Sequence, residues 1–232
     1  MNELPLTIKE HPRARRVLVK LVPGKGLEVV VPKGFDQSRI SGILQEKREW
    51  ITSNRRLMEA RGVRFVRSTA LPSVMSFPCV DRQWEIHYLP KSGPLRLTPN
   101  ASRLIVSGEQ DDPATLQAAL AKFVAKQARE LLPPLLHQTS KRLELPFESV
   151  RIRTQKSRWG SCSVRKTISL NCKLLFLPPE LVEQLMVHEL CHTRHMNHSP
   201  AYWQLVAKFQ PDYQQLEKRL SQALALVPDW MP

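Results

Sequence analysis

The stretch from Leu181 to Trp203 constrains the fold of this 232-residue chain more than any other segment. It reads LVEQLMVHELCHTRHMNHSPAYW and contains the pattern H-E-x-x-H at residues 188–192. Residues four apart lie on the same face of an α-helix, so His188 and His192 can bind one ion with metal–nitrogen distances of about 2.0–2.1 Å. Apolar side chains recur around them with helical spacing, at Leu181, Leu185, Met186 and Leu190. The sequence therefore predicts a largely buried helix that carries two metal ligands.

A third ligand is needed, and the two histidines that follow the pattern compete for this role. On a continued helix His195 would lie roughly 10 Å from His188, at about 1.5 Å per residue, which is too far for both to bind one ion. His198 can reach the ion if the helix ends soon after His192, and the sequence Asn-His-Ser-Pro at 197–200 favours such an end. The spacing equals that of the pattern H-E-x-x-H-x-x-G-x-x-H, with His195 at the glycine position. We therefore predict that His188, His192 and His198 are the metal ligands.

The residue types in this pattern indicate hydrolytic chemistry. Three neutral imidazoles leave a fourth position open, as in catalytic zinc sites, whereas structural sites are closed by four protein ligands. We therefore expect one zinc ion as cofactor, with Glu189 as the general base that takes a proton from a zinc-activated water. Charge that develops on a substrate oxygen needs a further stabilising group, for which Tyr202 and Arg158 are the candidates.

Composition limits the location and the partners of the protein. Hydrophobic residues make up 42% of the chain and charged residues 24%, which is ordinary for a soluble protein. The sequence has no apolar run of membrane-spanning length, no signal-peptide core and no C-x-x-C pair. We expect a cytoplasmic protein with free thiols and without membrane contact. The formal net charge of +14 favours polyanionic partners such as nucleic acid, nucleotide phosphates or acidic proteins, or else reflects a solvated basic surface without a specific partner.

Hydrophobic periodicity predicts an α+β fold in two parts. Residues 1–110 form a β-rich N-terminal region with one helix from about Asp36 to Arg61. Its strands are expected within 6–34 and around 74–80, 83–89, 95–98 and 103–106. Residues 111–232 form the catalytic domain and begin with a long helix capped by Asp112. Pro133-Pro134 should kink or split that helix. A strand at 149–153, a hairpin through 171, the metal helix and a last helix to about residue 226 follow.

Several motifs together resemble the YgjP-like family of predicted metal-dependent hydrolases, which belong with the zincin-type metallopeptidases and are similar to WLM and SprT-like proteases. The motifs are Ser157-x-Trp159-Gly160-Ser161-Cys162-Ser163, Ile168-x-Leu170-Asn171, Val187-His188-Glu189-Leu190-Cys191-His192 and Asn197-His198-Ser199-Pro200-x-Tyr202-Trp203. The resemblance implies His188, His192 and His198 as zinc ligands and Glu189 as general base. It also implies a zincin-like core in which a strand pair flanks the active-site helix. Members of the family carry both peptidase and UTP pyrophosphatase labels, so the resemblance defines the site better than the reaction.

Three functions remain open at this point. The first is a zinc metallopeptidase, in which an extended peptide adds to the edge strand at Trp159, Gly160 and Ser161. The second is a nucleotide (UTP) pyrophosphatase that attracts phosphates with Arg158 and the other basic residues between 151 and 166. The third is a non-enzymatic, basic nucleic-acid-binding module with a structural metal, which would need a fourth protein ligand. The chain has neither a Walker-type glycine loop nor a carboxylate cluster for magnesium, so we favour the peptidase.

Overall fold

The computed structural model describes residues 4–22, 24–60, 63, 65, 70–156 and 158–231. The chain divides into two compact units, residues 1–68 and residues 69–232. The boundary predicted at 110/111 falls inside the second unit, because the strands between residues 74 and 108 share one hydrophobic core with the following helix. Each unit is described by itself.

The first unit is a three-stranded sheet with two helices. Its strands are β1 (Leu6–Glu10), β2 (Leu18–Val22) and β3 (Gly26–Val31), in the order β1-β3-β2. Strand β1 runs parallel to β3, and β2 runs antiparallel to it. The helix predicted from about Asp36 to Arg61 is interrupted at Lys47, where φ and ψ are −91° and 7°. It consists of η1 (Gln37–Arg39), α1 (Ile40–Glu46) and α2 (Arg48–Ala60).

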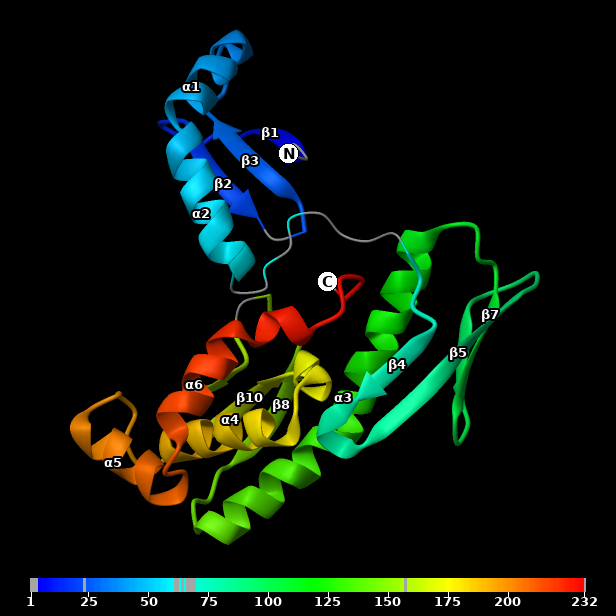
Figure 1. The fold of residues 1–232 in the computed structure, drawn as a ribbon, viewed down its shortest axis with the longest axis vertical. Helices are drawn as coiled ribbons and strands as arrows, with labels where there is room; N and C mark the ends of the chain where they lie inside the picture. The colour runs from blue at the N-terminus through cyan, green and yellow to red at the C-terminus, as the bar shows by residue number, and fades with distance from the viewer. Residues whose placement is uncertain are drawn as a thin grey trace. The chain divides into compact units, whose positions relative to one another are not determined.

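The second unit begins with a four-stranded sheet that lies beside a long helix (Figure 1). The strands are β4 (Val74–Phe77), β5 (Arg82–Pro90), β6 (Arg96–Pro99) and β7 (Arg103–Gly108), in the order β4-β5-β7-β6, and η2 (Pro78–Val80) follows β4. Alternate side chains of this sheet are buried, as a sheet with one covered face requires. They are Met75, Phe77, Trp84, Ile86, Leu104 and Val106.

The long helix α3 (Pro113–Leu143) runs without interruption through 31 residues. Asp112 caps it, since its side chain accepts hydrogen bonds from the backbone of Ala114 and Thr115. The two prolines at 133 and 134 do not divide the helix. Each proline lacks the backbone N–H of a helical hydrogen bond. Burial of neighbouring side chains, such as Leu132 and Leu136, stabilises the helix in place of these bonds.

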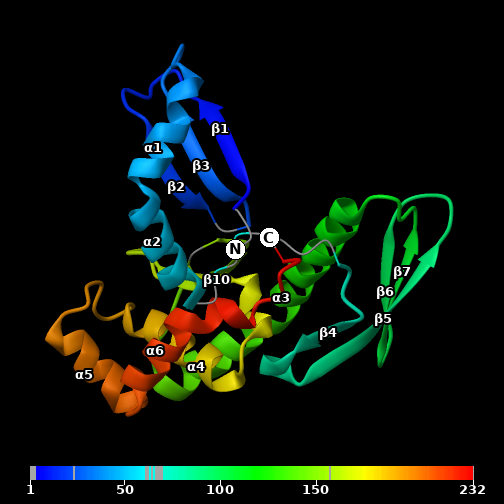
Figure 2. The same ribbon diagram turned by 45° about the horizontal axis from the view of Figure 1, so that its top comes forward.

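The remainder of the second unit is a mixed sheet followed by helices. The sheet contains β8 (Ser149–Arg153), β9 (Gly160–Cys162) and β10 (Thr167–Asn171), in the order β8-β10-β9. Strand β9 is antiparallel to β10, as the predicted hairpin requires, whereas β8 is parallel to β10. The helical elements are η3 (Cys172–Phe176), α4 (Pro179–Cys191), α5 (Pro200–Phe209), α6 (Tyr213–Gln222) and η4 (Ala223–Leu226). Figure 2 shows α4 and α6 side by side, with α5 beyond one end of α4.

These elements confirm the predicted α+β class. In the described part of the chain, none of the helices combines the length and the apolar character that crossing a membrane requires.

Candidate metal centre

Three histidine rings converge where α4 ends and the chain turns toward α5. His188, His192 and His198 each offer one ring nitrogen, and these atoms all lie within 4.8 Å of one another. The closest pair, Nε2 of His188 and Nε2 of His198, is 3.2 Å apart. Two nitrogens that bind one tetrahedral zinc ion at about 2.0–2.1 Å lie roughly 3.4 Å from each other. The spacing of the donors therefore fits a single metal ion.

The turn after α4 brings the third histidine back to the first two. Helix α4 is followed by a tight turn, in which the backbone nitrogens of Arg194 and His195 both bond to the carbonyl oxygen of Cys191. A new helix starts at Pro200, after the side chain of Ser199 caps the backbone nitrogen of Tyr202 at 3.4 Å. His198 lies in the short link between the two helices. The side chain of His195 is not part of the cluster.

Two of the three rings are oriented by a hydrogen bond at the nitrogen that faces away from the cluster. Nδ1 of His192 lies 2.9 Å from the carbonyl oxygen of His195, and Nδ1 of His188 lies 3.1 Å from Oε1 of Glu217. A carbonyl or carboxylate oxygen accepts a proton, so each Nδ1 carries the hydrogen and each Nε2 keeps its lone pair. Such partners fix the tautomer of metal-binding histidines.

The Glu189 carboxylate is buried beside the histidines. Glu189 is 4% exposed, and its Oε2 has no hydrogen-bond partner among the described residues. The backbone of Gly160 on β9 packs directly against it: a Cβ atom on residue 160 would lie 2.6 Å from Oε1 of Glu189. An unpartnered buried carboxylate oxygen next to three imidazoles is the arrangement expected of a site that receives a metal ion and a polar reactant.

Burial changes the acid–base properties of these groups. It raises the pKa of Glu189 to about 7, although the nearby His188 acts in the opposite direction. Burial also lowers the pKa values of His192 and His198, which favours the neutral rings that metal binding requires. Burial alone would raise the pKa of Glu217, but the hydrogen bonds from His188 and Gln184 outweigh burial, so the pKa is lowered.

The residues predicted to contact the substrate surround the same hollow to different degrees. Arg158, Gly160 and Ser161 line it together with the histidines and Glu189, and its volume is about 270 Å³. Trp159 does not line this hollow, and its indole Nε1 donates to the carbonyl oxygen of Leu220 at 3.1 Å. Strand β9 lies at an edge of its sheet, as the predicted substrate strand must.

Tyr202, the other residue predicted to contact the substrate, is a buried residue of α5. Its side chain is fully buried, and its hydroxyl donates a hydrogen bond of 3.1 Å to the carbonyl oxygen of His188. Burial raises the pKa of Tyr202 well above its usual range. The ring stacks on His192 at a centroid distance of 4.5 Å. The hydroxyl thus contacts the backbone of α4.

Sequence reasoning missed the residues that support the site. Glu217 follows His188 by 29 residues and belongs to no motif, so only the amphipathic pattern of α6 could have placed it toward α4. Asn171 belongs to one of the motifs named above, but its structural role was not predicted. Its side-chain nitrogen donates to the carbonyl oxygens of Gln155 and Arg158, both at 2.8 Å, and thereby fastens the loop before β9.

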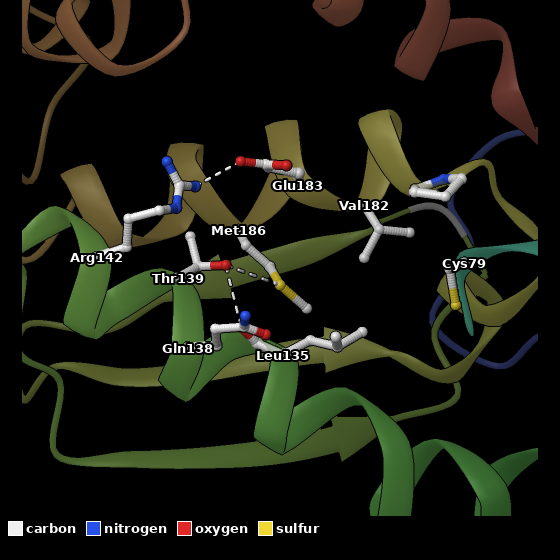
Figure 3. Close-up of a pocket in the computed structure, with 9 residues that line it drawn as sticks. Cys79, Leu135, Gln138, Thr139, Arg142, Val182, Glu183 and Met186 are labelled. Carbon is white, nitrogen blue, oxygen red and sulfur yellow. Dashed lines mark hydrogen bonds and ion pairs between the residues drawn. The ribbon is translucent and has the colours of Figure 1, made fainter. Parts of the chain in front are cut away.

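A separate pocket of about 200 Å³ lies between α3 and α4 (Figure 3). Its lining includes Met186 and Val182, and the ion pair of Arg142 with Glu183 lies at its edge. It shares none of its lining residues with the metal centre. Its one thiol, Cys79, is a poor nucleophile because burial raises its pKa to about 12.

The cysteines do not add a ligand to the cluster. Cys191 is fully buried within α4, and burial raises its pKa to about 12. Among the described residues, the histidine, cysteine and acidic side chains contribute no fourth member to the group formed by His188, His192 and His198. The contact with nucleic acid inferred from the charge stays a prediction.

Similarity to known proteins is found among protein families and among solved structures. A family model described as YgjP-like, metallopeptidase domain, matches residues 15–223. No curated protein matches the chain. Among solved structures, it is similar to the metallopeptidase zymogen abylysin of Pyrococcus abyssi, with 28% identity over 40% of this chain and 95% of that chain and a TM-score of 0.37. It is also similar to the metallopeptidase zymogen jannalysin of Methanocaldococcus jannaschii, with 20% identity, the same two coverages and a TM-score of 0.36.

Proposed function

Because the chain belongs to the family with the YgjP-like metallopeptidase domain, we propose that it is a zinc-dependent peptidase whose reaction takes place at the histidine cluster. The observation that carries this proposal is the position of Glu189, buried with an unpartnered oxygen beside three converging imidazoles. His188, His192 and His198 would hold the ion. Bound zinc would supply Lewis acidity and lower the pKa of a coordinated water to about 7.

Glu189 moves the proton in this proposal. Its Oε2 accepts a proton from the attacking water and then returns it to the nitrogen of the departing amine. In the metal-free protein burial raises the pKa of this carboxyl group to about 7, so its carboxylate form accepts a proton more readily than an exposed glutamate does. The close contact with Gly160 limits the positions that the carboxylate can take.

Strand β9 would bind the peptide. It lies at the edge of the β8-β10-β9 sheet and borders the hollow that contains Glu189. An extended peptide that adds to this edge would place one of its carbonyl groups over the cluster, with main-chain hydrogen bonds providing affinity. This mode of binding needs an unfolded or extended substrate segment.

Arg158 supports a second candidate, a nucleotide pyrophosphatase. Its exposed side chain lines the hollow and can pair with a phosphate group. The other basic residues named for this role give less support. Arg151 and Arg153 lie on β8, which is separated from β9 by β10.

The test compares zinc-loaded wild type with Glu189→Gln. Both proteins are incubated with unfolded polypeptides and, separately, with nucleoside triphosphates, and their zinc content is measured. We expect wild type to cleave the polypeptides, and Glu189→Gln to retain zinc while losing most of this activity. Cleavage of nucleotides alone would establish the second candidate instead, and equal behaviour of the two proteins on every substrate would exclude both.

A further inference from the structure

Glu217 lies on α6, outside every motif of the sequence, and yet it contacts one of the three clustered histidines. Its Oε1 is 3.1 Å from Nδ1 of His188 and 2.9 Å from Nε2 of Gln184. Gln184 and His188 are one turn apart on α4, so a single carboxylate oxygen bridges two consecutive turns of that helix. Gln184 is fully buried, so packing restricts the movement of the side chain that donates to Glu217.

We propose that Glu217 is the positioning residue of the metal centre: its carboxylate keeps the ring of His188 in the orientation and tautomer in which Nε2 can bind the ion. The inference rests on the proposed function only for the identity of the ion and the reaction. The contact between Glu217 and His188 does not depend on either.

The chemistry of the contact selects the tautomer. A neutral imidazole has one N–H, and an ionised carboxylate can only accept hydrogen bonds. The proton of His188 must therefore sit on Nδ1, which leaves the lone pair of Nε2 directed at Nε2 of His198, 3.2 Å away. Without Glu217 the ring is free to carry its proton on Nε2, where it would block the ion. Outer partners of this kind typically contribute about 10–100-fold to metal affinity.

A second contact between α4 and α6 lies away from the histidine cluster and provides a matched control. Arg219 of α6 forms an ion pair of 2.7 Å with Glu180 at the start of α4. This pair joins the same two helices as Glu217 does, but it lies two turns before His188. If Glu217 only docked α6 on α4, the loss of Glu180 and the loss of Glu217 would have similar consequences.

The first measurement is zinc affinity, determined by competition with a chelator for wild type, Glu217→Ala, Glu217→Gln and Glu180→Gln. We expect Glu217→Ala to weaken zinc binding by roughly 10–100-fold. Glu217→Gln keeps an oxygen that can accept from Nδ1 and should recover most of this loss. Glu180→Gln should bind zinc like wild type. A similar loss of affinity in Glu217→Ala and Glu180→Gln would overturn the inference, since it would show that helix docking alone matters.

The second measurement needs neither metal nor activity. Long-range proton–nitrogen NMR spectra of the metal-free protein at pH 8.5 report which nitrogen of His188 carries the hydrogen, with circular dichroism to verify folding. We expect Nδ1–H in wild type and Glu217→Gln, and a shift toward Nε2–H in Glu217→Ala. An unchanged tautomer in folded Glu217→Ala would overturn the inference. If both measurements give the expected results but no peptide is cleaved, the positioning role stands and the proposed function fails.

Discussion

Gly160 packs so closely against the carboxylate of Glu189 that a Cβ atom at residue 160 would require this carboxylate to shift. A Cβ atom at residue 160 would lie 2.6 Å from Oε1 and 3.0 Å from Cδ of Glu189. The requirement for glycine at this position comes from the approach of β9 to α4. It explains why a glycine opens the edge strand, and it links the proposed peptide-binding strand to the proposed general base.

The substitution Gly160→Ala should therefore displace the Glu189 carboxylate while leaving the three histidines in place. We expect kcat for peptide cleavage to fall by roughly 10–100-fold, since misplacement of a catalytic group by about 1 Å has effects of this order. Zinc content should remain that of wild type. The matched control is Gly42→Ala in α1, where an added Cβ meets nothing within 4 Å. Full activity of Gly160→Ala would show that the carboxylate has room to move.

Substitution of His198 and of His195, one at a time, should have different effects on zinc affinity, because only the ring of His198 belongs to the cluster. We expect His198→Ala to lose zinc affinity by more than the roughly 10–100-fold typical of outer partners, because it removes a donor atom itself. His195→Ala should bind zinc nearly as wild type does, since residue 195 contributes its main-chain oxygen to His192. Competition titration with a chelator measures both. Equal losses in the two variants would contradict the assignment of His198.

Local patterns in the sequence predicted most of the elements that make up the site. The spacing of His188 and His192 requires a helix, and the Asn-His-Ser-Pro sequence at 197–200 required that helix to end, so the convergence of the three rings followed from short-range rules. The α+β class followed from periodicity in the same way. The assignment of these residues to catalysis remains a prediction.

Contacts between distant parts of the chain could not be predicted in this way. The partnership of Glu217 with His188 depends on how α6 packs on α4, and neither segment carries a signal for the other. The parallel pairing of β8 with β10 likewise joins strands that are not adjacent in sequence. The packing of β4–β7 on α3 is a third case, because composition does not reveal that these strands bury their side chains in the same core as the helix.

The substitution Tyr202→Phe tests whether the hydroxyl of Tyr202 stabilises the fold or takes part in catalysis. Its buried hydroxyl donates to the carbonyl oxygen of His188, so Tyr202→Phe should lower the free energy of unfolding by about 1 kcal/mol. The kcat should stay close to that of wild type, because the hydroxyl contacts the backbone of α4. Tyr213→Phe is the control, since the hydroxyl of Tyr213 accepts an exposed hydrogen bond of 3.4 Å from Gln214, which should contribute little stability. A large fall in kcat without loss of stability would instead support the predicted contact between Tyr202 and the substrate.

Glu189 should make the stability of the metal-free protein depend on pH in a defined direction. Its pKa is raised from 4.5 to about 7 by burial, so its protonated form is favoured in the folded state. The stability that this provides is fully present below pH 4.5 and is lost as the pH rises through 7. At about 1.4 kcal/mol for each pKa unit, the loss amounts to roughly 3 kcal/mol.

The substitution Glu189→Gln removes this effect, because an amide does not ionise. Denaturant unfolding is measured from pH 4 to pH 9 with chelator present. As the pH rises, the free energy of unfolding of the variant should increase by about 3 kcal/mol relative to that of wild type. The lowered pKa values of His192 and His198 act on both proteins, so they largely cancel in the difference. The exposed Glu148→Gln serves as the control for the general effect of replacing a carboxylate by an amide. A flat difference for Glu189→Gln would mean that the carboxylate is ionised in the folded protein as readily as in the unfolded chain.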